Sequence, residues 1–237
     1  MSLRALHNIP TNIRIYTVDN RTLKDLLYEQ VARVGKALAS PKRLELLEML
    51  AQGEKAVETL ATDVAIDVKL ASAHLKALRE ARLVQSSREG KRMVYRLSGG
   101  DIAPLGVMLR QVAEEHLLEL RLALRQMMAE PDRMTSMGRK ELLAQAKRGE
   151  VIVLDVRPQS EYDTAHLPFA RSLPLPELAK RLSELPRDAE IVAYCRGPFC
   201  LMSDEAVKFL QKRGYRARKT FDGVSAWQAA GLPLARP

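Results

Sequence analysis

Residues 190–200 read Glu190-Ile191-Val192-Ala193-Tyr194-Cys195-Arg196-Gly197-Pro198-Phe199-Cys200. The run Ile191–Tyr194 is apolar and typical of a short buried strand. Downstream, acidic residues around Asp204 and basic residues around Lys212 are typical of the start and the end of a helix. The stretch therefore predicts a loop that joins a buried strand to a helix and holds both cysteines of the chain.

Cys195 is the residue of this loop that most suggests chemistry. Backbone N–H groups of the loop and the positive end of the following helix would lower the pKa of its thiol and bind an anion. The alternative is a buried structural cysteine, which is common for single cysteines. Two cysteines five residues apart in a Gly-Pro loop favour the reactive thiol.

Composition sets broad limits. The chain has 237 residues, of which 46% are hydrophobic, and a formal net charge of +9. This length suits two compact domains or one large one. No apolar run of about 18 residues occurs and the N-terminus is too polar for a signal peptide, so we expect a soluble cytoplasmic protein with no membrane partner. Two cysteines are too few for a disulfide scaffold. The basic charge suggests a polyanionic partner, but it is spread over both halves.

The N-terminal half predicts a winged helix-turn-helix. After an arm at residues 1–20, apolar residues recur every three or four positions in 22–40 and 44–50, and two more helices are expected at 57–64 and 67–81. Residues 83–87 and 93–97 flank a basic segment with Gly90 and predict a β-hairpin.

A long helix is expected next, from about Asp101 to Met128. Its apolar stripe has near-heptad spacing and passes through His116. Such a stripe is longer than one small domain needs, so we predict that this helix pairs with a second copy of the chain. Residues 130–136 read as a linker between a domain at 21–129 and a domain at 137–237.

The C-terminal half alternates strands and helices. The expected elements lie at residues 141–147, 151–156, 176–182, 191–194, 204–212, 217–221 and 224–230. Short buried strands between helices predict an α/β domain with a mainly parallel sheet.

Three stretches of the N-terminal half resemble the ArsR family of winged-helix repressors: residues 37–47, 72–84 and 88–97. The resemblance implies a homodimeric transcriptional repressor that binds a double-stranded DNA operator. The helix from Asp67 would enter the major groove and the hairpin tip would hold the DNA backbone or the minor groove. The expected DNA contacts are Val68, Lys69, Ser72, Ala73, His74, Lys76, Arg88, Lys91 and Arg92. Alternatively, these residues form a solvated face that pairs with protein, and His74 is partly structural.

Many ArsR proteins release DNA when a metal or an oxidant binds. His116 and Glu119 match half of the family's interfacial zinc site, but Ala103 stands where another histidine is needed. We therefore expect no metal and no cofactor, and interpret His116 as a packed residue of a dimer interface. Because this half has no cysteine, a thiol signal must come from the other domain.

Residues 137–237 resemble a rhodanese domain. The matching motifs are Leu154–Pro158 with Glu161-Tyr162, Ala165–Pro168, Tyr194–Gly197, Phe221–Trp227 and Gly231–Pro233. The resemblance implies that Cys195 attacks the outer sulfur of a small donor of the thiosulfate type, becomes a persulfide and passes this sulfur to a thiol acceptor.

The resemblance also implies roles for other residues. A persulfide cradle is expected from Arg196, Gly197, Pro198, Phe199 and Leu201, although Pro198 has no N–H to donate. Arg196 either attracts an anionic donor or forms a salt bridge. Asp155, Arg157 and His166 are expected to be structural.

Three positions depart from the rhodanese pattern. Ala165 and Phe169 stand where glycine is usual, which should alter the packing near the loop. Cys200 is either a thiol that resolves the persulfide into an intraloop disulfide or a small residue that caps the helix. The seventh loop residue is Leu201 rather than the arginine of related phosphatases, which disfavours phosphatase and arsenate-reductase chemistry.

The leading hypothesis is a DNA-binding regulator whose rhodanese domain transfers or senses sulfane sulfur through a persulfide on Cys195. An alternative is a sulfurtransferase whose helix-turn-helix half serves mainly as a dimerisation scaffold. A third interpretation makes the rhodanese domain an inert binding module.

Overall fold

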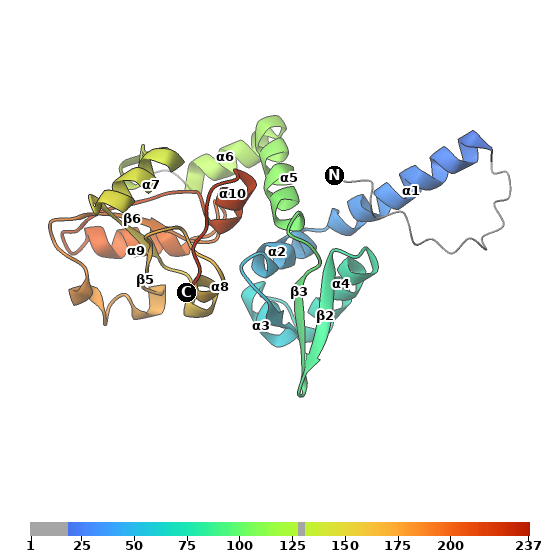
Figure 1. The fold of residues 1–237 in the computed structure, drawn as a ribbon, viewed down its shortest axis with the longest axis horizontal. Helices are drawn as coiled ribbons and strands as arrows, with labels where there is room; N and C mark the ends of the chain where they lie inside the picture. The colour runs from blue at the N-terminus through green and yellow to red at the C-terminus, as the bar shows by residue number, and fades with distance from the viewer. Residues whose placement is uncertain (1–18, 128–130) are drawn as a thin grey trace.

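The computed structural model of the chain describes residues 19–127 and 131–237. Most of the expected N-terminal arm (residues 1–18) and residues 128–130, at the end of the expected long helix and the start of the linker, lie outside the described part. The chain forms two domains side by side, with helix α1 projecting from one end (Figure 1). No helix in the described ranges is long and apolar enough to cross a membrane.

The N-terminal domain is a winged helix-turn-helix, as the sequence predicts. Its elements are α1 (Asn20–Leu38), α2 (Pro41–Leu50), β1 (Lys55–Ala56), α3 (Val57–Asp63), α4 (Val68–Glu80), β2 (Val84–Glu89) and β3 (Arg92–Leu97). The three strands form an antiparallel sheet in the order β1-β3-β2. Fully buried leucines of α2, α3 and α4, including Leu46, Leu60 and Leu75, form the core.

Side-chain caps define where two of these helices begin. The Asp19 carboxylate accepts hydrogen bonds from the backbone N–H groups of Arg21 and Thr22 at the start of α1. The Asp67 carboxylate accepts from the N–H of Leu70, at 2.9 Å, at the start of α4. Such caps satisfy N–H groups that have no partner within the helix.

The expected single helix at residues 101–128 is two helices, so this prediction is wrong. Helix α5 (Ile102–His116) ends where Leu117 is extended, with φ −104° and ψ 109°, and α6 (Leu118–Met127) follows. The apolar periodicity continues on both sides of the break, and neither glycine nor proline marks it. The spacing of apolar residues therefore cannot predict a helix break that consists of one extended residue.

The C-terminal domain is an α/β domain with an entirely parallel sheet, in the order β5-β4-β6-β7. Its helices and strands are α7 (Arg139–Arg148), β4 (Val151–Asp155), α8 (Gln159–Thr164), β5 (Arg171–Ser172), β6 (Glu190–Tyr194), α9 (Met202–Gln211), β7 (Arg216–Lys219) and α10 (Val224–Ala229).

Both faces of this sheet are covered at its centre, which explains the apolar runs of the two central strands, β4 and β6. Leu154 and Ala193 pack on one side with residues of α9, whereas Val153 and Val192 pack on the other with residues of α7 and with Trp227 of α10. Successive side chains of a strand point to opposite faces, so a strand buried on both sides is apolar at nearly every position.

Four segments of the C-terminal half differ from the sequence prediction. Residues 176–182 hold no regular helix or strand beyond the edges of two short 3-10 turns, Leu175–Glu177 and Leu182–Glu184. Helix α8 and strand β5 were not anticipated. The described part of the expected linker forms a 3-10 turn, Pro131–Arg133, and then joins β7: Thr135 donates from its backbone to the carbonyl of Lys219 at 2.9 Å. This part of the linker therefore belongs to the sheet edge.

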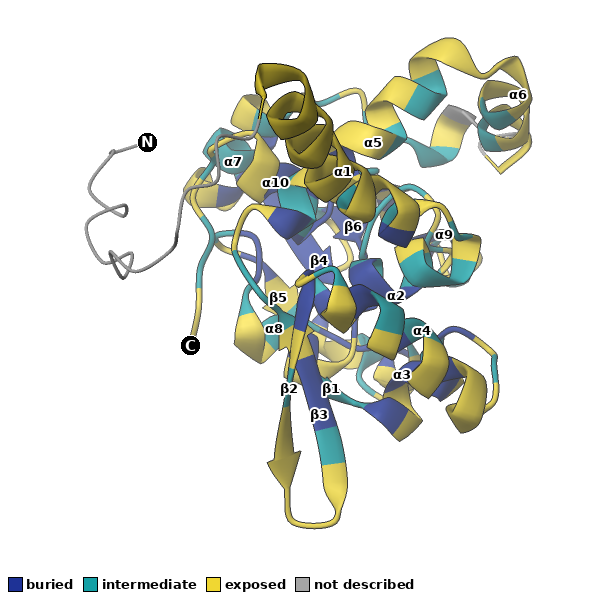
Figure 2. Ribbon diagram, turned by 90° about the vertical axis from the view of Figure 1, so that its right-hand side faces the viewer, coloured by how far each residue is buried: buried dark blue, intermediate teal, exposed yellow. Residues whose placement is uncertain are grey.

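The two domains are in direct contact. Helix α10 packs against α5, and Gln228 of α10 donates to the carbonyl of Gly100 at 3.3 Å. The surfaces of α1, α6 and the β2–β3 hairpin are mostly exposed, in contrast to the buried strands of the C-terminal sheet (Figure 2).

Candidate functional site

Cys195 lies directly after the carboxyl end of β6, at the centre of the parallel sheet. Its side chain is buried, with 3% of its surface exposed. The thiol lies 3.3 Å from the hydroxyl of Ser203 and can donate to the backbone carbonyls of Cys200, at 3.4 Å, and Gly197, at 3.9 Å. The carboxyl ends of parallel strands are where α/β domains place their ligands.

The loop after Cys195 is compact and leads into α9. The backbone N–H of Cys200 donates to the carbonyl of Gly197, at 3.1 Å, which closes the turn. Gly223 is required on the other side: a Cβ at this position would collide with the backbone oxygens of Cys195 and Arg196. This close approach gives a physical reason for the glycine in the motif at 221–227.

The thiol of Cys195 ionises unusually easily. Burial opposes its ionisation, but hydrogen bonds from Cys200, from Ser203 and from backbone groups outweigh this cost and lower its pKa to about 7. The neighbouring Cys195 sulfur, together with burial, raises the pKa of Cys200. Cys195 is thus the thiolate of the pair and Cys200 the protonated partner, which makes Cys195 the better nucleophile near neutral pH.

Asp155 and Arg157 pin the strand ends around Cys195. Both side chains are completely buried, and Arg157 Nη2 lies 2.6 Å from Asp155 Oδ2. The hydroxyl of Tyr194, the residue before Cys195, donates to the same carboxylate. Arg157 also donates to the carbonyl of Ala165 at 2.8 Å. The network satisfies two buried charges and ties β4 to β6 at the edge where the loop begins.

The partners of His166 within the described part of the chain are structural. Its ring stacks on Tyr162 with 3.7 Å between the ring centroids, and Nδ1 lies 2.9 Å from the carbonyl of Tyr162. Its backbone pairs with Ala235. Nearby, Phe169 has a φ of +64°, the left-handed conformation that favours glycine. This explains why glycine is usual at this position, and the Phe169 side chain itself is 54% exposed.

Arg196 is held in a salt bridge rather than free for a donor. Its Nη2 lies 2.6 Å from Glu161 Oε1 and 3.9 Å from Asp63 of the N-terminal domain. Of the other cradle residues, Gly197 and Pro198 are half-buried, whereas Phe199 and Leu201 are exposed.

The loop faces the DNA-binding domain, and buried polar contacts cross between the two. Lys55 of β1 donates to Glu161 at 2.9 Å; these side chains are 9% and 2% exposed. Arg157 donates to Gln52 at 2.9 Å. Buried charges are costly unless paired, so these contacts hold the domains in register.

Three neighbours of the site were not predicted from the sequence: Gln52, Lys55 and Asp63. They belong to the other domain, and no spacing rule places them beside a loop more than a hundred residues away. Glu161 did carry a signal, because it belongs to a rhodanese motif, but its cross-domain partner did not.

The predicted DNA contacts form two surfaces. On α4, Val68, Lys69, Ser72, Ala73 and Lys76 are exposed opposite the buried Ala71, Leu75 and Leu78, whereas His74 is half-buried. Arg88, Lys91 and Arg92 are exposed at the hairpin tip. His116 and Glu119 are also exposed, but they lie on different helices, on either side of Leu117. Within residues 19–127 and 131–237, no group of three His, Cys, Asp or Glu side chains could hold a metal ion.

These features define a winged helix-turn-helix protein that carries a rhodanese-like domain. Residues 40–86 match the family described as bacterial regulatory protein, arsR family, and residues 138–230 match the rhodanese-like domain. The HTH-type transcriptional regulator Rv0324 of Mycobacterium tuberculosis is 44% identical over 211 residues, which cover 89% of this chain and 92% of that protein. The chain belongs to the ArsR family of transcriptional regulators, with a rhodanese-like domain after its DNA-binding domain.

Two further similarities each cover one domain. A sulfurtransferase of Allochromatium vinosum is 34% identical over 89 residues, which cover 37% of this chain and 81% of that protein. The solution structure of the homodimeric winged helix-turn-helix DNA-binding domain Mb0332 of Mycobacterium bovis is 47% identical, covers 44% of this chain and 95% of that chain, and has a TM-score of 0.39. Both family predictions from the sequence are confirmed by the family matches.

Proposed function

We propose that this regulator is a repressor that accepts sulfane sulfur on Cys195 and whose affinity for its operator depends on that sulfur. One observation carries the proposal: the loop that holds Cys195 packs against the DNA-binding domain, and Arg196 of this loop reaches Asp63 at the end of α3. A chemical change at Cys195 therefore takes place in a loop that contacts the helix-turn-helix.

The sulfur step needs no oxidant. The Cys195 thiolate attacks the outer sulfur of thiosulfate, a new sulfur–sulfur bond forms, and the bond to the sulfonate sulfur breaks. Sulfite leaves with the electron pair, and Cys195 becomes an anionic persulfide. The low pKa of Cys195 supports this step because a large share of the thiol is thiolate at neutral pH.

Cys200 acts as a resolving thiol in this scheme. Its sulfur attacks the inner sulfur of the persulfide, a Cys195–Cys200 disulfide forms, and hydrosulfide leaves with the proton of Cys200. Atoms and charges balance without an added oxidant. The hydrogen bond between the two thiols, which raises the pKa of Cys200, supports this role over that of a helix cap. The N-cap position of α9 is Leu201, which has no side-chain cap.

The signal passes through two ion pairs and one backbone strand pairing. A persulfide anion beside Arg196 competes with Glu161 for its guanidinium group. Glu161 also binds Lys55, and Lys55 pairs with Tyr95 in the hairpin strand β3. Weakening one link therefore changes the charge balance at the base of the wing, which is a DNA-binding element in this fold.

The operator is bound by two copies of the chain. Exposed apolar residues along α1 (Leu23, Leu27 and Val31) and on α5 (Leu109 and Val112) offer an unpartnered surface that a second copy would bury. The exposed face of α4 and the basic hairpin tip would contact the major groove and the DNA backbone.

A gel-shift titration tests the proposal. The operator is first selected from random DNA with the purified full-length protein, and its affinity is measured before and after treatment with a sulfur donor. We expect the affinity of the wild type to change and that of Cys195→Ser to stay constant. Identical affinity for both proteins under all sulfur conditions would refute the coupling. Failure to select any DNA, with rapid sulfur transfer, would instead favour a sulfurtransferase with a scaffold domain.

A further inference from the structure

The two domains enclose a cavity of about 740 Å³ that the sulfur chemistry does not use. Its walls come from α2 and α5 of the DNA-binding domain and from the loop, α9 and α10 of the rhodanese domain. Cys195 is buried beneath the loop and is not part of these walls. A molecule in the cavity would therefore touch both domains without reaching the reacting sulfur.

Most of the wall is apolar. The apolar residues include Leu47, Met49, Val107, Phe199, Leu201 and Ala226. Phe199 and Leu201 are 45% and 53% exposed, so a ligand in contact with them would remove apolar surface from water. Both the volume of the cavity and its lining are typical of pockets that bind small organic molecules.

The charged side chains of the wall favour a cation. Both guanidinium groups already have partners, because Arg110 binds Glu114 and Arg196 binds Glu161. Acidic side chains outnumber these two in the described wall, although the whole chain is basic, with a net charge of +9. The acidic residues are Glu45, Glu48, Asp63 and Glu205. The wall would therefore attract an organic cation and repel an organic anion.

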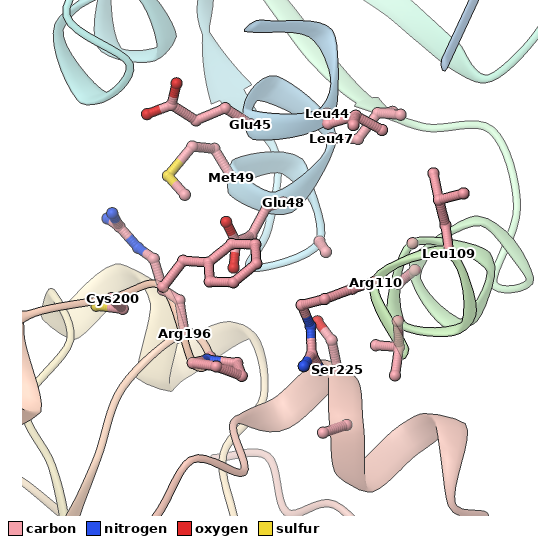
Figure 3. A pocket seen from close by; sticks show the side chains of 18 of the residues that line it. Leu44, Glu45, Leu47, Glu48, Met49, Leu109, Arg110, Arg196, Cys200 and Ser225 are labelled. Carbon is pink, nitrogen blue, oxygen red and sulfur yellow. The ribbon is translucent and has the colours of Figure 1, made fainter. Parts of the chain in front are cut away.

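Glu48 is a half-buried acidic residue without a direct partner. Its carboxylate makes no hydrogen bond or ion pair with any residue in the ranges 19–127 and 131–237. Figure 3 shows its side chain extending from α2 toward the loop, and a Cβ added to Gly197 would lie 3.3 Å from its Oε1. Burial raises the pKa of Glu48 despite the nearby Arg110 and Arg196. A cation beside the carboxylate would offset the cost of this burial.

A second unsatisfied polar group lies on the wall that the rhodanese domain supplies. The hydroxyl of Ser225, in α10, is buried and has no hydrogen-bond partner within the described part of the chain. Figure 3 shows it across the cavity from Glu48. A buried hydroxyl without a partner is costly, and a ligand that bonds to it would remove this cost. Each domain thus offers an unsatisfied polar group to the cavity.

We propose that this cavity binds an apolar amine, and that this ligand is an effector of operator binding that acts without sulfur. The ammonium group donates a hydrogen bond to Glu48, and the apolar body packs on Met49, Phe199 and Leu201. Helix α2 belongs to the same core as α4, the helix expected in the major groove. Because the ligand contacts both domains, it stabilises one docked arrangement of the helix-turn-helix over others. The inference goes beyond the proposed function, since it requires no thiol chemistry.

Isothermal titration calorimetry on the full-length protein tests the class of ligand. The probes are 4-phenylbutylamine, 4-phenylbutanol and 4-phenylbutanoate, which share a phenyl group and differ in the charge of the polar end. We expect the amine to bind about tenfold more tightly than the alcohol, because its hydrogen bond to Glu48 joins two charged groups. The carboxylate should bind most weakly. No saturable binding of the amine, or a carboxylate that binds as tightly, would overturn the proposal.

Substitutions link the binding to the cavity. Glu48→Gln should weaken the amine about tenfold and leave the alcohol unchanged. Glu58→Gln removes the same charge from an exposed residue of α3 outside the cavity and should change neither. Gly106 lines the cavity on α5, and a Cβ added there meets no atom within 4 Å. Gly106→Leu should therefore fill part of the space and weaken both probes several-fold. Wild-type affinity for the amine in Glu48→Gln or in Gly106→Leu would contradict the assignment.

Gel shifts with Cys195→Ser separate this inference from the sulfur chemistry. Saturating 4-phenylbutylamine should change the operator affinity of this variant several-fold, as it does that of the wild type, whereas a sulfur donor should act on the wild type alone. If bound amine changes the operator affinity of neither protein, the effector role is refuted. If the amine acts on the wild type but not on Cys195→Ser, its independence from sulfur is refuted. Neither result depends on whether Cys195 accepts sulfur.

Discussion

At the scale of single residues, the two cysteines have different proposed roles: Cys195 is the nucleophile and Cys200 the resolving thiol. Their sulfur atoms share a hydrogen bond, and this bond favours the charge on Cys195 and disfavours it on Cys200. The nucleophile has to be ionised to attack the donor. The resolving thiol reacts only after the persulfide has formed, so it can stay protonated until then. The opposite pKa shifts fit this order of events.

The first prediction concerns the pH dependence of Cys195. Because the thiolate reacts and the pKa is about 7, the alkylation rate of Cys195 by iodoacetamide should fall about tenfold per unit below this pH and level off above it. In Cys200→Ala the hydrogen bond from Cys200 is lost, so the midpoint should rise. Cys200→Ser keeps a donor and is the control. A midpoint in Cys200→Ala equal to that of the wild type would show that Cys200 does not stabilise the thiolate.

The second prediction concerns Phe169. Its φ of +64° is unfavourable for a residue with a Cβ, and its side chain is largely exposed. Phe169→Gly should therefore raise the free energy of unfolding by about 1 kcal/mol, measured by urea denaturation. Ala165→Gly is the matched control, because Ala165 is extended at φ −168° and should gain nothing. Destabilisation by Phe169→Gly would mean that the phenyl contacts outweigh the backbone strain.

At the scale of elements, the two-residue strand β1 has a larger role than its length suggests. Lys55 pairs through its backbone with Tyr95 of the wing and through its side chain with Glu161 of the rhodanese domain. The strand thus belongs to the DNA-binding sheet and to the domain contact at once.

The third prediction follows from this double role. Lys55→Met keeps the apolar stem but removes the bond to Glu161. Operator affinity should then change less, or not at all, when Cys195 is persulfidated, while the persulfide itself still forms. Gel shifts and mass spectrometry on the same samples measure the two properties. Lys180→Met, at an exposed site, is the control. A full wild-type response in Lys55→Met would exclude this route.

Sequence periodicity predicted most helices and strands, because each has its own local pattern. It failed at Leu117, where one extended residue divides a continuous apolar stripe, and at β5, whose two residues are too short to show alternation. In the site, Cys195 and its loop could be predicted because the motif is local. Gln52, Lys55 and Glu48 could not, because only the docking of the two domains brings them to the loop.

At the scale of the whole molecule, most of α1 projects from the DNA-binding domain and is exposed, whereas its C-terminal end packs on the core of that domain through Ala37 (Figures 1 and 2). Leu23, Leu27 and Val31 lie on one face and are 46%, 60% and 69% exposed. A helix of 19 residues with an uncovered apolar face is marginal by itself in water. A second copy of the chain would supply the missing contact.

The fourth prediction tests this dimer. Leu27→Glu places a charge in the centre of the apolar face of α1, in both copies at once. At about 2 kcal/mol for each buried leucine, the dimer should weaken at least about a hundredfold. Light scattering after size-exclusion chromatography measures the mass. Ala32→Glu adds the same charge away from this face and is the control. A dimer that survives Leu27→Glu would place the interface elsewhere.

The hydrogen bond between Arg157 and Gln52 limits how domains of this kind can be recombined. The guanidinium group that organises the rhodanese sheet relies on a glutamine of the neighbouring domain for one of its partners. The boundary between the domains is therefore not a place where modules can be exchanged freely. A rhodanese domain moved onto another regulator, by evolution or by design, would need an acceptor at the position of Gln52 and a cation at that of Lys55.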